Sequence, residues 1–106
     1  MQILIVNFNL DGLTREQFAG ACEELAPAFA AVPGLVSKVW LADQTDGVFG
    51  GVYTFESEQA VDDYLQSDLW AGVRSTPGLV NISARRFGVL DGPTRVTRGL
   101  PQDVAA

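Results

Sequence analysis

Short apolar runs alternate with helix-like repeats along the chain, and the runs predict four strands. Residues 2–9 (QILIVNFN) form a β-branched, apolar run that ends at the turn signal Asp11-Gly12, as expected of a buried strand. Residues 35–42 (LVSKVWLA) and 48–55 (VFGGVYTF) read as two more strands, joined by a hairpin loop that contains glycine. Residues 79–90 (LVNISARRFGVL) predict the last strand.

A first helix is predicted between the first two strands. Thr14 and Gln17 have the spacing of a capping box, which marks a helix start. Pro27 lacks a backbone donor, so we expect a kink or break near residues 23–27 and an end at Pro33-Gly34. One stripe at helical period is apolar and must be buried: Phe18, Cys22, Leu25 and Phe29.

A second helix is predicted after Ser57, a residue type that caps helices, and we expect it to fray near Gly72. Its apolar positions are Val61, Tyr64, Leu65 and Leu69. We therefore expect one domain over residues 1–91. Residues 92–106 form a tail with little pattern, which is either loose or wrapped around a partner.

The order βαββαβ predicts an α+β, ferredoxin-like fold with a four-stranded antiparallel sheet and two helices on one face. Alternation along the strands places Ile3, Ile5, Val36 and Trp40 on the other face. Leaving large apolar side chains in water would cost about 1.5–3 kcal/mol each. We therefore expect a homodimer in which a second copy covers this face.

Composition and charge exclude several classes of protein. Of 106 residues, 47% are hydrophobic and 19% charged, which suits one globular domain. The net charge of −6 has the wrong sign for a nucleic-acid binder. No leader segment or membrane span is evident, and the single cysteine forms no internal disulfide, so we expect a cytoplasmic protein that does not bind membranes.

Residues 33–55 (PGLVSKVWLADQTDGVFGGVYTF) and ARRF at 84–87 resemble the dimeric α+β-barrel superfamily, and within it the YdhR-type monooxygenases. The resemblance implies that sheets from two subunits close into a barrel, with a ligand cavity in each subunit. It also implies an activity like that of anthrone-type oxygenases of polyketide pathways, which use neither metal nor flavin, so no cofactor is expected. The same fold hosts other chemistries and simple binding modules.

The absence of histidine removes the commonest metal ligand, the axial ligand of haem-degrading relatives and the usual general base. The single cysteine rules out a thiolate zinc site, and no glycine-rich phosphate-binding motif occurs.

Lys38 and Trp40 are the candidate catalytic residues, because they share one side of their strand and match the family motif. Lys38 could lose its proton and act as a base, or keep it and stabilise an enolate. Alternatively, it could form a dimer salt bridge or extend to solvent. Trp40 is either a stacking wall for a flat substrate or a packing residue.

Asn7, Tyr53 and Arg85 are the candidate substrate-binding residues. Arg85 could orient a carboxylate or oxyanion, or form an interface ion pair. Asn7 needs a partner, either a backbone group or a substrate carbonyl. The Tyr53 hydroxyl could donate to a substrate, or the ring could pack across strands.

Two further features have alternative interpretations. Cys22 is either a core residue or a reactive thiol, and core packing is favoured because no histidine can activate it. Gly50-Gly51 marks either a bulge or close backbone contact, or space for a ligand.

The function best matched by these features is a cofactor-independent monooxygenase acting on an aromatic or polyketide-like molecule. The alternatives are a non-catalytic, small-ligand-binding or stress-associated dimer, and an isomerase, cyclase or decarboxylase on the same scaffold. We expect catalysis if Lys38 is buried away from carboxylates, and a structural role if it pairs with an acid such as Asp43 or Glu56.

Overall fold

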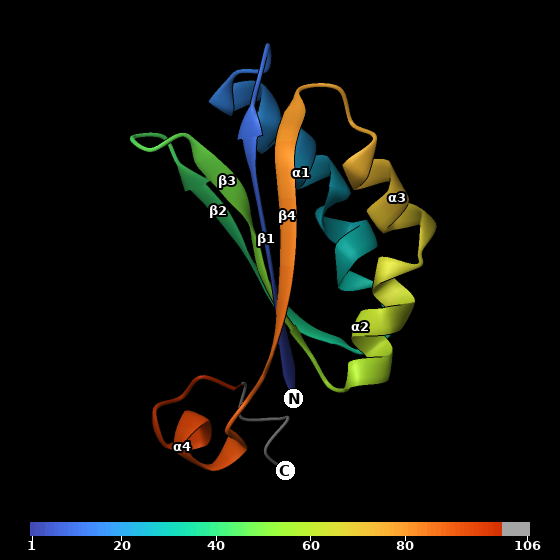
Figure 1. The fold of residues 1–106 in the computed structure, drawn as a ribbon, viewed down its shortest axis with the longest axis vertical. Coiled ribbons are helices and arrows are strands. Elements are labelled where there is room, and N and C mark those ends of the chain that lie inside the picture. The colour runs from blue at the N-terminus through green and yellow to red at the C-terminus, as the bar shows by residue number, and fades with distance from the viewer. Residues whose placement is uncertain (101–106) are drawn as a thin grey trace.

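A computed structural model describes residues 1–100 and shows one antiparallel sheet with helices on one face (Figure 1). Each neighbouring strand pair is antiparallel, and the strand order is β2-β3-β1-β4. The predicted α+β, ferredoxin-like fold is confirmed. The elements, in chain order, are β1 (Gln2–Leu10), α1 (Arg15–Ala30), β2 (Leu35–Asp43), β3 (Val48–Phe55), α2 (Glu58–Leu65), α3 (Asp68–Arg74), β4 (Leu79–Gly88) and α4 (Asp91–Val96).

The core lies between the sheet and helices α1, α2 and α3. Leu4, Val6 and Phe8 alternate along β1 and are buried, as the period of a strand requires. Phe55 and Val61 are fully buried where β3 leads into α2. Aromatic residues from the sheet and the helices fill most of this layer, so one side of the sheet is packed against the helices.

Helix α1 begins as predicted but does not break at Pro27. Thr14 Oγ1 accepts from the Gln17 backbone N–H at 3.1 Å, and Gln17 Oε1 accepts from the Thr14 N–H at 2.9 Å, completing the capping box. The helix then continues through Pro27 to Ala30. Of the expected kink or break near residues 23–27, the break was wrong: Pro27 and Glu23 are both exposed, so water can satisfy the carbonyl that lacks an intrahelical donor.

The second helical segment divides earlier than predicted. Helix α2 ends at Leu65, and α3 begins at Asp68 and runs through Gly72 to Arg74. Ser67 separates them: its hydroxyl donates to the Tyr64 carbonyl at 2.6 Å and accepts from the Trp70 N–H at 3.2 Å. The expected fraying near Gly72 was wrong because Ser67 ends one helix and caps the next.

The tail contains a short helix. Helix α4 extends away from the sheet (Figure 1). The amino group of Met1 lies 3.7 Å from Asp91 Oδ1. The part of the expected tail at 101–106 lies outside the described residues.

The open face of the sheet differs from the prediction. Trp40 pairs with Gly51 of β3, which pairs in turn with the buried Val6 of β1. Lys38 pairs with Tyr53, which pairs with the buried Leu4, so Lys38 and Trp40 point to the helix side. Placing Trp40 with Ile3 and Ile5 was therefore wrong. Alternation shows which residues of one strand share a side, but it does not relate that side to another strand.

The open face nevertheless remains apolar. Ile3 and Ile5 of β1 are partly exposed there, beside their strand neighbours Phe87 and Val52. Val39 is 59% exposed and Phe87 is 40% exposed. Within residues 1–100, none of the helices is both long and apolar enough to cross a membrane.

Candidate active site

Lys38 lies inside a cage of three aromatic side chains. Its Nζ atom is 3.4 Å from the ring centroid of Phe29, 3.4 Å from that of Trp40 and 4.5 Å from that of Tyr53. Phe29 and Trp40 meet edge to face, with centroids 5.1 Å apart. The rings come from α1, β2 and β3, so the cage forms only when the helix packs on the sheet.

Gly51 leaves the space through which the lysine side chain reaches the cage. A Cβ atom at Gly51 would lie 2.9 Å from Lys38 Cε and 3.2 Å from Tyr53 Cε1. Gly50 has a different role, because a Cβ there would lie 1.8 Å from the Val6 carbonyl oxygen and its φ is +148°. Gly50 thus permits a close backbone contact, and the space at Gly51 is taken by Lys38 rather than left for a ligand.

Burial among the rings lowers the pKa of Lys38 from 10.5 to about 7, because desolvation disfavours the charged amine. The ion pairs within the described residues are Met1 with Asp91 and Arg86 with Asp62, and neither includes Lys38. The pairing with Asp43 or Glu56 that would have favoured a structural role is therefore not formed. A large share of Lys38 is neutral at pH 7, as a general base requires.

Two tyrosines continue the site towards α2. The hydroxyl groups of Tyr53 and Tyr64 are 3.1 Å apart and hydrogen bonded. Burial raises the pKa of Tyr53 to about 12 and also raises the pKa of Tyr64. Both hydroxyl groups therefore keep their protons at neutral pH.

A small cavity and a groove adjoin this cage. The inner cavity has a volume of about 80 Å³ and lies between α1, α3 and the sheet, with Lys38, Cys22 and Tyr53 in its wall. The groove, of about 290 Å³, runs between α1 and the edge strand β2. Phe18, Cys22 and Trp40 line both hollows, so they separate the inner space from the outer one.

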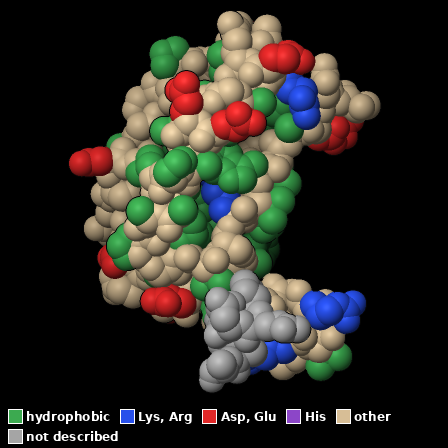
Figure 2. Space-filling model, turned by 180° about the vertical axis from the view of Figure 1, so that it is seen from behind, with side chains coloured by type: hydrophobic (Ala, Val, Ile, Leu, Met, Phe, Trp, Pro, Cys, Tyr) green, Lys and Arg blue, Asp and Glu red, His purple; other side chains and the backbone are tan. Residues whose placement is uncertain are grey.

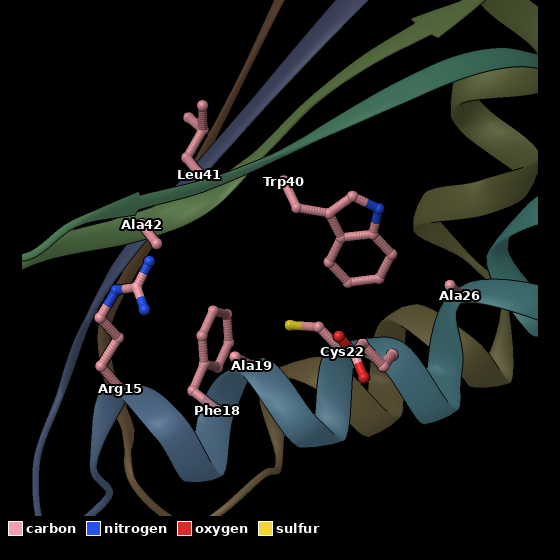
Figure 3. A pocket seen from close by; sticks show the side chains of 9 residues that line it. Arg15, Phe18, Ala19, Cys22, Ala26, Trp40, Leu41 and Ala42 are labelled. Atoms are coloured by element: carbon pink, nitrogen blue, oxygen red, sulfur yellow. The ribbon is translucent and has the colours of Figure 1, made fainter.

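The groove is apolar except at its ends. Trp40 and Cys22 point towards each other from β2 and α1, whereas Leu41 points to the other side of the sheet (Figure 3). Arg15 lies beside Ala42 at one end of the groove. The opposite side of the molecule from Figure 1 has hydrophobic side chains gathered around a basic one, with acidic groups nearer the rim (Figure 2). Such a groove suits a flat apolar molecule.

The other two predicted site residues lie elsewhere. Asn7 and Arg85 are on the open face of the sheet, where they share a shallow pocket with Ile5, Ser83 and Phe87. Arg85 lies on the same side as Ser83, as alternation along the strand predicts, and its guanidinium is 5.1 Å from the Phe87 ring centroid. The sheet thus separates Asn7 and Arg85 from Lys38, Trp40 and Tyr53.

Three residues around the cage and the groove were not predicted as site residues from the sequence: Phe29, Tyr64 and Arg15. Phe29 was identified only as a core residue, although it stands on the same helical stripe as Cys22. The sequence signal that pointed to Phe29 was a lysine on a strand that packs against a helix with an apolar, partly aromatic stripe. An amine on an apolar face needs ring contacts when it has no carboxylate partner.

Cys22 faces the cage but remains a neutral thiol. Burial raises its pKa, and the nearby Lys38 lowers it by a smaller amount. The side chain is partly buried and lines both hollows. This position matches the expected core role and also makes Cys22 a neighbour of any bound ligand.

The sequence of residues 3–100 matches the profile of the family described as "Putative mono-oxygenase ydhR". The chain belongs to the ydhR family. This match spans nearly all the described residues and confirms the family resemblance carried by residues 33–55 and 84–87. No curated protein matches the chain in a sequence search.

Several solved structures share the fold of this ydhR-family chain. The haem degrader MhuD from Mycobacterium tuberculosis, solved with two haems in its active site, is 16% identical, with a TM-score of 0.69 over 85% of this chain and 96% of its own. SnoaB, a cofactor-independent oxygenase from Streptomyces nogalater, is 19% identical, with a TM-score of 0.63 over 84% and 93%.

A third structure is the ActVA-Orf6 monooxygenase from Streptomyces coelicolor in complex with nanaomycin D. It is 23% identical, with a TM-score of 0.63 over 83% of this chain and 86% of its own. At these identities the likeness shows the fold alone.

The donor groups of this ydhR-family chain do not suit haem. The chain has no histidine, Cys22 keeps its proton, and Tyr53 keeps its proton and is hydrogen bonded to Tyr64, so the cavity does not offer the histidine, thiolate or tyrosinate ligand that haem iron ordinarily takes. Within residues 1–100, no group of three or more acidic, cysteine or histidine side chains is placed to hold a metal ion.

Proposed function

We propose that the protein is a monooxygenase that oxidises a flat, electron-rich aromatic molecule, such as a polyketide-like phenol or anthrone, without a metal or flavin. The observation that carries this proposal is the partly neutral Lys38 amine, which lies in an apolar aromatic cavity away from any carboxylate partner within the described residues. The family match and the fold shared with oxygenases support it.

In the proposed reaction, Lys38 removes a proton from the substrate and becomes an ammonium ion beside the resulting enolate. The substrate anion transfers one electron to dioxygen, and the two radicals combine to form a carbon–oxygen bond. Lys38 returns its proton to the peroxide, which loses water and leaves a carbonyl group. The carbon loses four electrons and dioxygen gains four, so one oxygen atom enters the product and the other leaves as water.

The surrounding groups have distinct parts in this reaction. Trp40 stacks on the substrate, because it forms the wall between the groove and the inner cavity. The Tyr53 hydroxyl, which keeps its proton, donates to a substrate oxygen. The dry, apolar lining strengthens the attraction between the ammonium group and the enolate.

The open face of the sheet supports a proposed homodimer. Its partly exposed apolar side chains, including Ile3, Ile5 and Val39, would be covered by a second copy. Asn7 and Arg85 lie on this face and, in the proposed dimer, would make polar contacts across the interface. Their predicted role as substrate-binding residues would then require a ligand on that side of the sheet.

The test is oxygen uptake, with product mass, on anthrone and hydroquinone in metal-free buffer. Wild-type protein should consume one dioxygen per product and add one oxygen atom to anthrone. Lys38→Met should lower the rate by about a hundredfold, the usual contribution of a general base. Lys38→Arg keeps the charge but cannot give up its proton, so it separates a base from a charge stabiliser.

Trp40→Phe should raise KM more than it lowers kcat, because it reduces the stacking surface. Arg95→Gln, a change on α4, is the matched control and should leave the rate unchanged. Tight binding of these compounds without oxygen consumption would contradict the oxygenase proposal and indicate a ligand-binding dimer. An isomerised or decarboxylated product formed in the absence of dioxygen would indicate an isomerase, cyclase or decarboxylase.

A further inference from the structure

Lys38 is the only lysine in the chain, and the other six basic residues are arginines. Lysine is ordinarily among the most exposed residues, because its charged amine is strongly hydrated. Here the single lysine is half-buried among aromatic rings. The only side-chain amine of the protein therefore borders its cavity.

Two hollows give a ligand access to this amine. Lys38 lines the inner cavity of about 80 Å³, and it also lines a second pocket of about 240 Å³ with Ala26, Phe29 and Trp40. Within residues 1–100, its amine makes contacts with rings and takes part in no hydrogen bond or ion pair. The amine can thus turn towards a ligand without leaving a polar partner unsatisfied.

We propose that the Lys38 amine condenses with an aldehyde or ketone group of an apolar molecule in this cavity and holds it as a reversible imine. The amine nitrogen attacks the carbonyl carbon, and the carbon–oxygen π bond breaks. A proton moves from nitrogen to oxygen to give a carbinolamine. Loss of water then leaves a carbon–nitrogen double bond, so both hydrogens of the amine depart with the carbonyl oxygen and no oxidant is needed.

The environment of the cage favours each step. Imine formation needs a neutral amine, and burial that lowers the pKa of Lys38 to about 7 provides it at neutral pH. The departing hydroxyl group needs a proton, and Cys22 and Tyr53, which line the same cavity, both remain protonated. The apolar walls limit the water that would hydrolyse the imine.

This carbonyl-binding activity goes beyond the proposed oxygenase. It requires no dioxygen and involves Lys38 as a nucleophile rather than as a base. A result without oxygen uptake would contradict the oxygenase proposal and not the imine proposal. A result without an imine would contradict the imine proposal and not the oxygenase proposal.

The experiment is reductive trapping under nitrogen at pH 7 with 2-naphthaldehyde and sodium cyanoborohydride, followed by intact mass and tryptic mapping. A trapped imine adds one naphthylmethyl group and blocks cleavage after Lys38, so that the peptide spanning residues 16–74 stays whole. We expect Lys38 to react about tenfold faster than the amine of Nα-acetyl-lysine amide, because far more of it is neutral.

The α-amino group of Met1 is the other amine in the chain and serves as an internal reference. Lys38→Arg should retain only the Met1 label. Unfolding the wild-type protein in urea should abolish the faster labelling of Lys38 relative to the model amine. This control does not depend on the folding of a variant. Labelling at Met1 alone, or labelling of native Lys38 no faster than the model amine, would overturn the proposal.

Discussion

At the scale of single residues, the proposed chemistry depends on the protonation state of Lys38. Its amine lies 3.4 Å from the ring centroids of both Phe29 and Trp40. Burial among these rings lowers the pKa of Lys38 to about 7, because desolvation disfavours the ammonium form. The cage therefore makes Lys38 reactive.

The neutral state of Lys38 should appear in the pH dependence of stability. Between pH 7 and 10.5 the unfolded chain holds a proton on Lys38 that the folded chain has released, so the free energy of unfolding should rise with pH in this window. Lys38→Met should lack this rise. Urea unfolding of both proteins, measured from pH 6 to 9.5, gives the difference.

The groups that face Lys38 are Cys22 on α1 and Tyr53 on β3, and both have raised pKa values. Their titration lowers stability at higher pH in either protein, so the comparison between the two proteins isolates the lysine. A lysine-labelled sample should show one side-chain signal titrating near pH 7 in NMR spectra. Titration near the ordinary value of 10.5 would contradict the buried state.

At the scale of elements, the two glycines of β3 have separate functions. Gly50 brings the backbone of β3 against β1, because a Cβ there would lie 1.8 Å from the Val6 carbonyl oxygen. Gly51 faces the end of a flexible side chain instead, since its Cβ would meet Lys38 Cε. One glycine thus shapes the sheet and the next shapes the active site.

Gly51→Ala should move Lys38 out of the cage with little loss of stability, about 1 kcal/mol or less, because a lysine tip can shift. The pKa of Lys38 should then rise towards its ordinary value, and naphthaldehyde trapping should slow. Gly50→Ala should cost about 3 kcal/mol or more, because it combines a backbone clash with a φ of +148°. Urea unfolding measures both changes.

Gly72→Ala is the control for these two variants, since a Cβ there meets nothing within 4 Å and the residue lies inside α3. It should stabilise the protein by about 0.5–1 kcal/mol through helix propensity. An equal loss of stability in the Gly50 and Gly51 variants would show that the glycine pair acts only on the sheet.

At the scale of the whole molecule, the sheet has two unlike faces. The helices cover one, where the aromatic cage lies, and leave the other with partly exposed apolar residues such as Ile5, Val39 and Phe87. The twist of the sheet does not hide these side chains from solvent. A sheet face that is apolar normally packs against another layer of structure. The proposed second copy would supply that layer.

Val39→Glu should convert the proposed dimer into a monomer, because it places a charge within the covered apolar face. Val96→Glu is the matched control: Val96 is 77% exposed and belongs to α4, a helix that stands away from the sheet (Figure 1). Analytical ultracentrifugation measures the mass in solution. A monomeric wild-type protein, or dissociation caused only by the Val96 change, would rule out dimerisation through the sheet.

The sequence by itself determined the strands, the helix caps and the order βαββαβ, because these depend on local periodicity and on side chains near in sequence, such as Thr14 and Gln17. It also placed Lys38 and Trp40 on one side of their strand, through alternation, and named Tyr53 as a candidate site residue without relating it to them. Dimerisation, substrate and cofactor use stay predictions.

Only the tertiary structure decided which face of the sheet these residues occupy, because the pairing of β2 with β3 sets that choice. It also placed Phe29 of α1 over Lys38 and separated Asn7 and Arg85 from the cage. Such contacts join residues distant in sequence, so no local pattern encodes them. The reactive amine is thus a property of the packed layers rather than of the motif that contains Lys38.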